Sequence, residues 1–149
     1  MSRVKIGLID YGIGNIKSVY SSFKNLDCEI VFSSNPKDFY EIDKILLVGV
    51  GTFNNGMKNL QKLGFDEYIK NHIEKGKHIF GICLGMQILF SLGYENYKTE
   101  GLDLIKGKVV SIKENANLRV PHIGWNNLDI KNFDKMLLLK NIDIDSNFY

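Results

Sequence analysis

An unbroken run of four apolar residues, Ile45-Leu46-Leu47-Val48, constrains the fold of this chain most. A strand with one face in water alternates apolar and polar residues, so a continuous apolar run predicts a strand that is buried on both faces. Such strands occur mainly in parallel sheets that helices cover on each side. The run ends at Gly49-Val50-Gly51, where the chain is expected to leave the sheet. We therefore expect a layered α/β fold.

The rest of the chain repeats this alternation of strands and helices. Further strands are expected at residues 4–9, 28–32 and 78–82, and helical spacing of apolar residues is expected at 15–23, 56–63, 65–75 and 84–92. This order predicts a doubly wound, mostly parallel sheet with helices on both faces, as in flavodoxin-like folds. From Gly93 onward the chain reads as β-rich, with strands expected at residues 108–112 and 128–130. No linker divides the sequence, so residues 1–149 are interpreted as a single, C-terminally incomplete domain.

Composition excludes several classes of protein. The chain has 149 residues, of which 44% are hydrophobic and 24% charged, and this profile excludes a disordered chain. A formal net charge of +2 gives no sign of a nucleic-acid or membrane-surface partner. The N-terminal residues do not resemble a signal peptide, and no stretch approaches the roughly 18 to 20 apolar residues of a spanning helix. We expect a cytoplasmic protein.

The two cysteines, Cys28 and Cys83, are too few for a disulfide scaffold, and each is expected to be a free thiol. No Cys/His cluster has the spacing of a metal site, and no metal or other cofactor is expected. The turn with Gly12 and Gly14 resembles the start of a dinucleotide fingerprint, but Lys17 stands where the third glycine belongs. A nicotinamide cofactor is therefore not expected.

Cys83 lies between Gly81 and Gly85, at the point where a buried strand is expected to turn into a helix. This is the form of a nucleophile elbow, in which a strained turn exposes the nucleophile and the flanking glycines remove steric collisions. The helix N-terminus favours the reactive thiolate, and the N–H of Leu84 is placed to stabilise an oxyanion. The alternative is that Cys83 is a small buried apolar residue, which is how we interpret Cys28.

Four segments of the chain together resemble a known family. They are D-Y-G-I-G-N at residues 10–15, G-V-G-T-F at 49–53, G-I-C-L-G-M-Q at 81–87 and V-P-H-I-G-W-N at 120–126. The third is typical of the class-I, triad-type glutamine amidotransferases. The fourth resembles the glutaminase subunits of imidazole glycerol phosphate synthases, which act in histidine biosynthesis.

The resemblance implies an activity and a site. Cys83 would attack the side-chain amide of glutamine, form a glutamyl thioester and release ammonia. The remaining site residues implied are the oxyanion and substrate-binding group Gly49, Gly51, Leu84, Gln87 and Glu95. The ammonia would pass to a (β/α)8-barrel cyclase subunit in a heterodimer. The cyclase interface implied by the resemblance comprises Pro121, His122, Trp125 and Asn126.

The sequence also departs from the family pattern. The family's general base and its orienting carboxylate form an H-P-E motif downstream of the 120–126 segment, and no such motif occurs here. His122 belongs to its own motif, and His72 and His78 are interpreted as structural. We therefore expect the chain to be truncated before the catalytic His and Glu, and to be inactive alone. Val48 stands where many relatives have proline.

Two other functions remain open at this stage. One is a shortened, non-catalytic subunit that binds the cyclase or another synthase through the segment around Trp125. The other is a paralogue that keeps the glutaminase chemistry but supplies ammonia for a different amidation, such as that of nucleotide sugars.

Overall fold

The structure is a computed structural model that describes residues 3–112, 123–129, 137–143 and 145–149. It divides into two compact units, Met1–Ser111 and Ile112–Tyr149, and each unit is described by itself. The expectation that residues 1–149 form a single domain stays a prediction.

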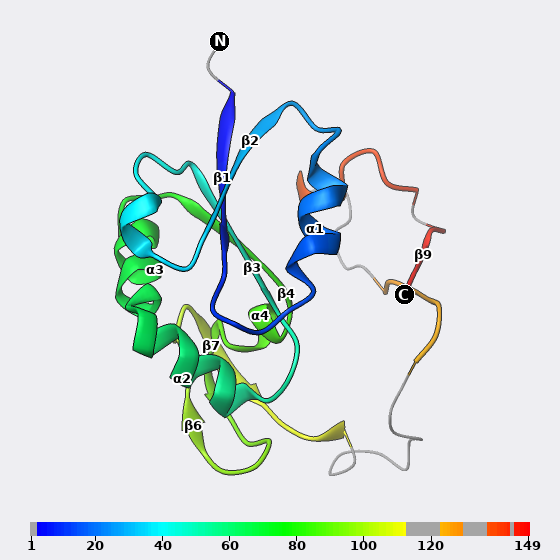
Figure 1. The fold of residues 1–149 in the computed structure, drawn as a ribbon. Coiled ribbons are helices and arrows are strands. Elements are labelled where there is room, and N and C mark those ends of the chain that lie inside the picture. Colours follow the sequence, from blue (N-terminus) through cyan, green and yellow to red (C-terminus); the bar gives the residue numbers. More distant parts are fainter. Residues whose placement is uncertain (1–2, 113–122, 130–136, 144) are drawn as a thin grey trace. The chain divides into compact units, whose positions relative to one another are not determined.

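The first unit contains a four-stranded sheet in the order β2-β1-β3-β4 (Figure 1). Its strands are β1 (Val4–Ile9), β2 (Cys28–Ser33), β3 (Lys44–Gly49) and β4 (His78–Cys83). Every neighbouring pair in this sheet is parallel. The strands expected at residues 4–9, 28–32, 45–48 and 78–82 are thereby confirmed.

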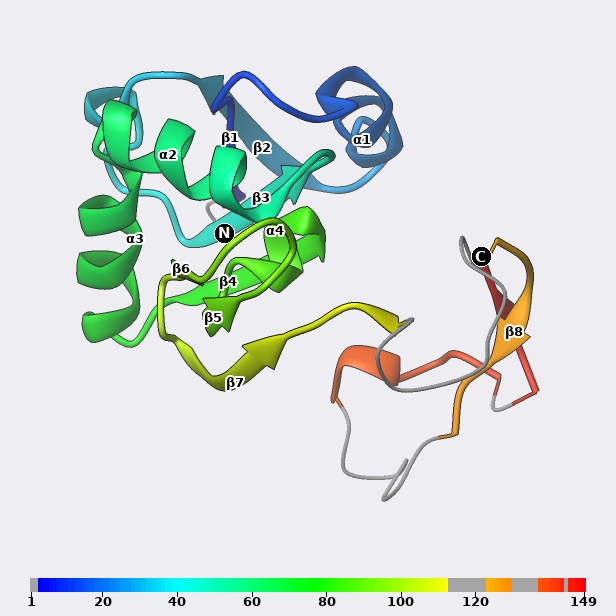
Figure 2. The same cartoon turned by 90° about the horizontal axis from the view of Figure 1, so that it is seen from below.

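Helices cover both faces of this sheet, as Figures 1 and 2 show. Helix α1 (Ile16–Phe23) lies on one face, and α2 (Phe53–Leu63) and α3 (Phe65–Glu74) lie on the other. The side chains of β3 alternate accordingly. Ile45 and Leu47 join the core on the α2 and α3 side, whereas Leu46 and Val48 join the core on the α1 side. The expectation of burial on both faces and the doubly wound fold class are confirmed.

The parallel strands all end at one edge of the sheet, the lower edge in Figure 1. This edge carries Tyr11 after β1, the Gly49–Gly51 segment at the end of β3 and Cys83 at the end of β4. Helix α4 (Leu84–Gln87) starts here as well. In open α/β sheets the carboxyl edge is where ligands bind, so this arrangement places the glycine turns and Cys83 where a site is expected.

The helix expected at residues 84–92 is wrong in length, because α4 ends at Gln87 and residues Phe90–Gly93 form strand β5. In a longer helix the carbonyls of Ile88 and Leu89 would accept bonds from four residues further on. Instead, the Ile88 carbonyl accepts the N–H of Leu102 and the Leu89 carbonyl accepts those of Leu104 and Ile105. Non-local hydrogen bonds thus replace the helical ones.

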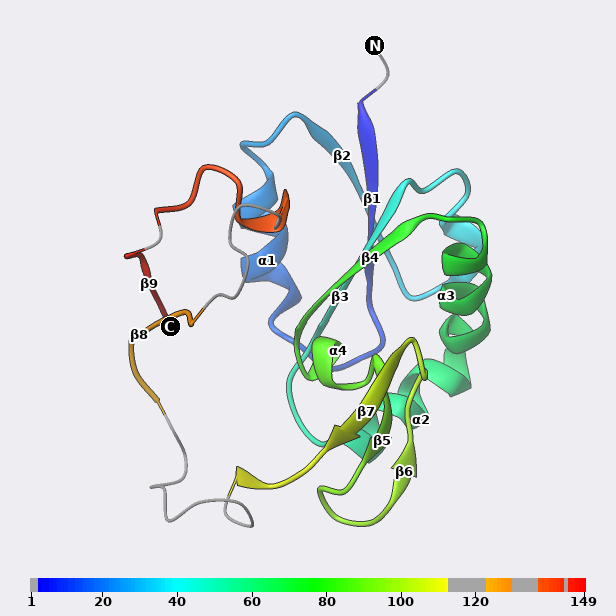
Figure 3. The same ribbon diagram turned by 180° about the vertical axis from the view of Figure 1, so that it is seen from behind.

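Strand β5 is the centre of a second small sheet in the order β6-β5-β7 (Figure 3). Its partners are β6 (Thr99–Glu100), which is antiparallel, and β7 (Ile105–Val109), which is parallel. The strand expected at residues 108–112 is therefore shifted, because its partner β5 is four residues long and the pairing ends at Gly93 with Val109. Hydrophobicity alone does not locate such a boundary.

The second unit contains an antiparallel pair, β8 (Asn126–Asn127) with β9 (Asn147–Phe148), and a 3-10 turn at Leu137–Leu139. The strand expected at residues 128–130 is wrong for Leu128 and Asp129, and Ile130 lies outside the described residues. Strand β8 consists of two asparagines, which hydrophobic periodicity does not identify as a strand. Within the described part of the chain, no helix is long and apolar enough to cross a membrane.

Replacing Leu60 by alanine should test the core on the α2 side. Leu60 is 0% exposed, so Leu60→Ala should lower the free energy of unfolding by about 2–5 kcal/mol. Leu26 is 56% exposed, and Leu26→Ala should cost less than about 1 kcal/mol. Urea denaturation followed by circular dichroism measures both values. Equal losses in the two variants would contradict this core assignment.

Candidate active site

Cys83 occupies the turn between β4 and α4 in a backbone conformation that side chains rarely adopt. Its φ is 55° and its ψ is −120°, and its thiol is free and exposed. A residue held with positive φ stores strain that the surrounding structure must support, and such positions cluster at functional sites. The nucleophile elbow predicted from the sequence is therefore present, and Cys83 is not a buried apolar residue.

The two flanking glycines are required for different reasons. A Cβ on Gly81 would lie 2.5 Å from the Cα of Met86, in the backbone of α4. A Cβ on Gly85 would lie 1.9 Å from the carbonyl oxygen of Leu47, in the neighbouring strand β3. The sequence predicts that both glycines relieve collisions at the turn. This holds for Gly81, whereas Gly85 allows α4 to approach β3.

The Gly49–Gly51 segment lies beside this turn. Gly49 is the register partner of Cys83 in the pairing of β3 with β4. Gly51 is exposed, has a φ of 113°, and would have no atom within 4 Å of an added Cβ. Leu84 is the first residue of α4, so its N–H has no partner within the helix. The N–H of Leu84 and the backbone of the Gly49–Gly51 segment therefore flank Cys83. The short α4 also means that a helix dipole contributes less here than a nine-residue helix would.

Two hydroxyl groups at this segment are buried without a hydrogen-bond partner. They are the Tyr11 hydroxyl and the Thr52 Oγ1 atom, and the described residues contain no other buried side-chain nitrogen or oxygen without a partner. The Tyr11 ring is 1% exposed, and a Cβ added to Gly49 would lie 2.0 Å from its hydroxyl oxygen. Burial raises the pKa of the Tyr11 phenol, and the negative charge of a Cys83 thiolate raises it further. Tyr11 is therefore a neutral donor.

Glu95 is held next to the same segment. Its Oε2 atom accepts a hydrogen bond of 2.7 Å from the backbone N–H of Phe53, the first residue of α2. Thr52 is the N-cap residue of α2 but makes no capping bond with its side chain, so the carboxylate of Glu95 serves this purpose. Gln87, the other residue predicted to bind the substrate, is half-buried at the end of α4. Their roles stay predictions.

The predicted partner interface falls in the second unit. Pro121 and His122 lie outside the described residues. Trp125 is 71% exposed, and its ring packs edge-on against Tyr149 with 5.5 Å between the centroids. Asn126 is the first residue of β8. The interface role of these residues stays a prediction.

The two histidines of the first unit lie at the opposite end of the sheet from Cys83. His78 begins β4 and Cys83 ends it, which separates them by about 16 Å at the usual rise of a strand. The Nε2 atom of His72 donates to the carbonyl of His78 at 3.2 Å, and burial lowers the pKa of His72. Their structural interpretation agrees with these positions.

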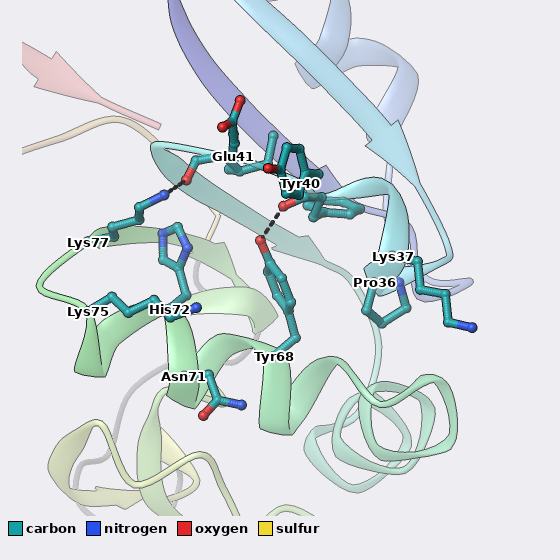
Figure 4. A pocket seen from close by; sticks show the side chains of 11 residues that line it. Pro36, Lys37, Tyr40, Glu41, Tyr68, Asn71, His72, Lys75 and Lys77 are labelled. Atoms are coloured by element: carbon teal, nitrogen blue, oxygen red, sulfur yellow. Dashed lines mark hydrogen bonds between the residues drawn. The ribbon is translucent and has the colours of Figure 1, made fainter.

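His72 also lines a pocket of about 530 Å³ between α3 and the connection from β2 to β3 (Figure 4). Lys75, Lys77 and Glu41 line it as well, and the Tyr68 hydroxyl donates to the Phe39 carbonyl at 2.9 Å beside it. This pocket adjoins the amino ends of β3 and β4, so it is separate from the site around Cys83.

The sequence did not indicate that the Tyr11 side chain lies at this site. Its motif follows β1, and β1 pairs with β3, so the end of β1 lies beside the end of β3. The backbone of Tyr11 is fixed by α2, because Asn59 Nδ2 donates to the Tyr11 carbonyl at 2.9 Å. The adjacency of strand ends in a parallel sheet could have indicated this position, but the burial of the hydroxyl could not be read from the sequence.

Comparisons with known proteins show the family to which the chain belongs. Residues 7–139 match the family model described as glutamine amidotransferase class-I. The chain is 46% identical over 145 residues to the imidazole glycerol phosphate synthase subunit HisH 1 of Campylobacter jejuni strain RM1221, covering 97% of this chain and 71% of that protein. It is 45% identical over 126 residues to the HisH subunit of Caldanaerobacter subterraneus subsp. tengcongensis, covering 85% of this chain and 61% of that relative.

A solved structure described as a glutamine amidotransferase has the same fold. It superimposes with a TM-score of 0.59 at 16% sequence identity, covering 69% of this chain and 54% of that one. The chain therefore belongs to the class-I glutamine amidotransferase family. Within it, the similar proteins named above are imidazole glycerol phosphate synthase subunits.

Adding a methyl group at Gly85 should disrupt the nucleophile turn. The methyl group of Gly85→Ala would meet the Leu47 carbonyl, so α4 must move from β3 at a cost of about 2 kcal/mol or more. A Cβ on Gly124 has no atom within 4 Å, and Gly124→Ala serves as the control. Thermal unfolding of both variants measures the difference. Equal melting temperatures for the two variants would refute the close approach.

Proposed function

We propose that this chain supplies the nucleophile and the oxyanion donors of a glutaminase subunit of imidazole glycerol phosphate synthase. One observation carries the proposal: an exposed cysteine held at positive φ, followed directly by the first N–H of α4 and paired in register with Gly49. The family membership and the names of the relatives support it.

The reaction begins with attack by the Cys83 thiolate on the side-chain amide carbon of glutamine. The carbonyl oxygen becomes an oxyanion, for which we propose the N–H groups of Leu84 and of the Gly49–Gly51 segment as donors. Collapse of this intermediate breaks the carbon–nitrogen bond, forms the glutamyl thioester and releases ammonia. Water then hydrolyses the thioester to glutamate and regenerates the thiol.

Both half-reactions move protons, and this requires a general base. The leaving nitrogen must gain a proton and the attacking water must lose one. His72 and His78 lie too far from Cys83, at the other end of the sheet. We propose that the base comes from outside residues 1–149, as the missing H-P-E motif predicts.

The ammonia acceptor is proposed from the relatives, which are subunits of a synthase. We propose that a (β/α)8-barrel cyclase subunit receives the ammonia and forms imidazole glycerol phosphate. In this proposal the segment with Trp125 and Asn126 contacts the cyclase. The cytoplasmic location expected from the sequence also stays a prediction.

Replacing the nucleophile tests the proposal directly. In the complete native subunit assembled with its cyclase, Cys83→Ala should reduce glutaminase turnover by at least about a thousandfold, because no other group forms the thioester. Cys28 is the matched control, since it lies half-buried in β2, and Cys28→Ala should keep the wild-type rate. Glutamate release measures both.

The outcomes separate the alternatives. If wild type and Cys83→Ala release glutamate at the same background rate, the protein is a non-catalytic binding subunit. If wild type is active but its ammonia is not used by the cyclase, the paralogue with another acceptor is favoured.

The substrate-binding role of Glu95 gives a second test. A carboxylate next to the oxyanion segment suits the ammonium group of glutamine, and Glu95→Gln should raise KM for glutamine by about tenfold or more. The exposed Glu100 on β6 is the control, and Glu100→Gln should leave KM unchanged. Steady-state kinetics of both variants provide the values. An unchanged KM in Glu95→Gln would assign this carboxylate to capping α2 alone.

A further inference from the structure

The Tyr11 hydroxyl is an unusual group because it is buried, neutral and unpaired. Leaving a buried hydroxyl without a partner costs about 1–3 kcal/mol, so proteins seldom keep one without a function. Its position is well defined, since its oxygen lies against the Cα of Gly49 and its backbone is fixed by Asn59. The second unpaired hydroxyl, that of Thr52, lies at the other end of the same segment.

The segment between these two hydroxyls has room to change its conformation. A Cβ built on Gly51, which has positive φ, would meet no atom within 4 Å, and Val50 is 52% exposed. A trans peptide carries its N–H and its C=O on opposite sides. When the segment points an N–H outward to the substrate, it therefore turns a carbonyl inward. The Tyr11 hydroxyl lies on this inner side, because it is buried whereas Val50 and Gly51 are exposed.

We propose that Tyr11 is a positioning residue for the oxyanion segment, and this inference rests on the glutaminase function proposed above. Its hydroxyl donates to a backbone carbonyl of residues 49–51 when that segment binds the oxyanion. The hydrogen bond forms in the reacting state and is missing in the state that the structure describes. It stabilises the transition state more than the bound substrate, and so it raises kcat rather than lowering KM.

The test replaces Tyr11 by phenylalanine in the complete subunit assembled with its cyclase. Glutaminase kcat should fall by about three- to tenfold, the range that one neutral hydrogen bond provides, with little change in KM for glutamine. The melting temperature should not fall, because the change removes a buried hydroxyl that has no partner. The pH profile of Cys83 alkylation by iodoacetamide should remain that of wild type, because the hydroxyl acts on the backbone segment.

Tyr68 provides the matched control. Its hydroxyl donates to the Phe39 carbonyl at the other end of the sheet (Figure 4), so Tyr68→Phe should lower the melting temperature by a few degrees and keep kcat. An unchanged kcat in Tyr11→Phe, with an active wild type, would overturn the positioning role. A clear shift in the pH profile of Cys83 alkylation in Tyr11→Phe would also overturn it, because the Tyr11 hydroxyl would then act on the Cys83 thiolate and not on the backbone segment. If wild type and Cys83→Ala are equally inactive, the glutaminase function itself fails.

Discussion

The site depends on the close approach of two backbones, that of α4 and that of β3. Gly85 contacts the Leu47 carbonyl so closely that no side chain fits between them. At this approach the chain turns from β4 into α4, and Cys83, the residue at the turn, has positive φ. The strain at Cys83 is sustained by the buried core around Leu47 and Leu84, which are both almost fully buried.

The two ends of the sheet differ in how completely their polar groups are paired. At the amino end, the side chains of His72, Tyr68 and Lys77 each bond to a backbone carbonyl. At the carboxyl end, the hydroxyls of Tyr11 and Thr52 have no partner. The paired groups at the amino end stabilise a single arrangement. The unpaired donors at the carboxyl end can gain hydrogen bonds when that end changes its conformation. The carboxyl edge, where the candidate site lies, therefore keeps buried donors that can still gain a partner.

The sequence predicted the four-stranded sheet well because each strand is a short run rich in apolar residues, and the central strand β3 is buried on both faces. Continuous apolar runs such as residues 45–48 are a local signal that needs no knowledge of partners. The prediction of a helix over residues 84–92 was wrong because distant parts of the chain decide the structure there. Ile88 and Leu89 have helical spacing, but their carbonyls bond to residues 102–105, and such long-range competition is not visible locally. Strand β8 was not predicted, because it consists of polar residues and is defined only by its pairing with β9.

The parts of the candidate site that depend on the positions of glycines could be predicted from the sequence. The parts that depend on how side chains pack could not. Gly81 and Gly85 frame Cys83 in any chain of this pattern, so Cys83 could be named as the candidate nucleophile from the sequence. The contact of Glu95 with Phe53 joins residues 42 positions apart, and only the folded chain brings them together. The Tyr11 hydroxyl is harder still to predict, because what marks it is the absence of a hydrogen-bond partner in the folded chain. A buried donor beside an acceptor that has room to move favours whichever conformation completes the bond, and we propose that at this edge it is the conformation that turns a backbone N–H toward the substrate.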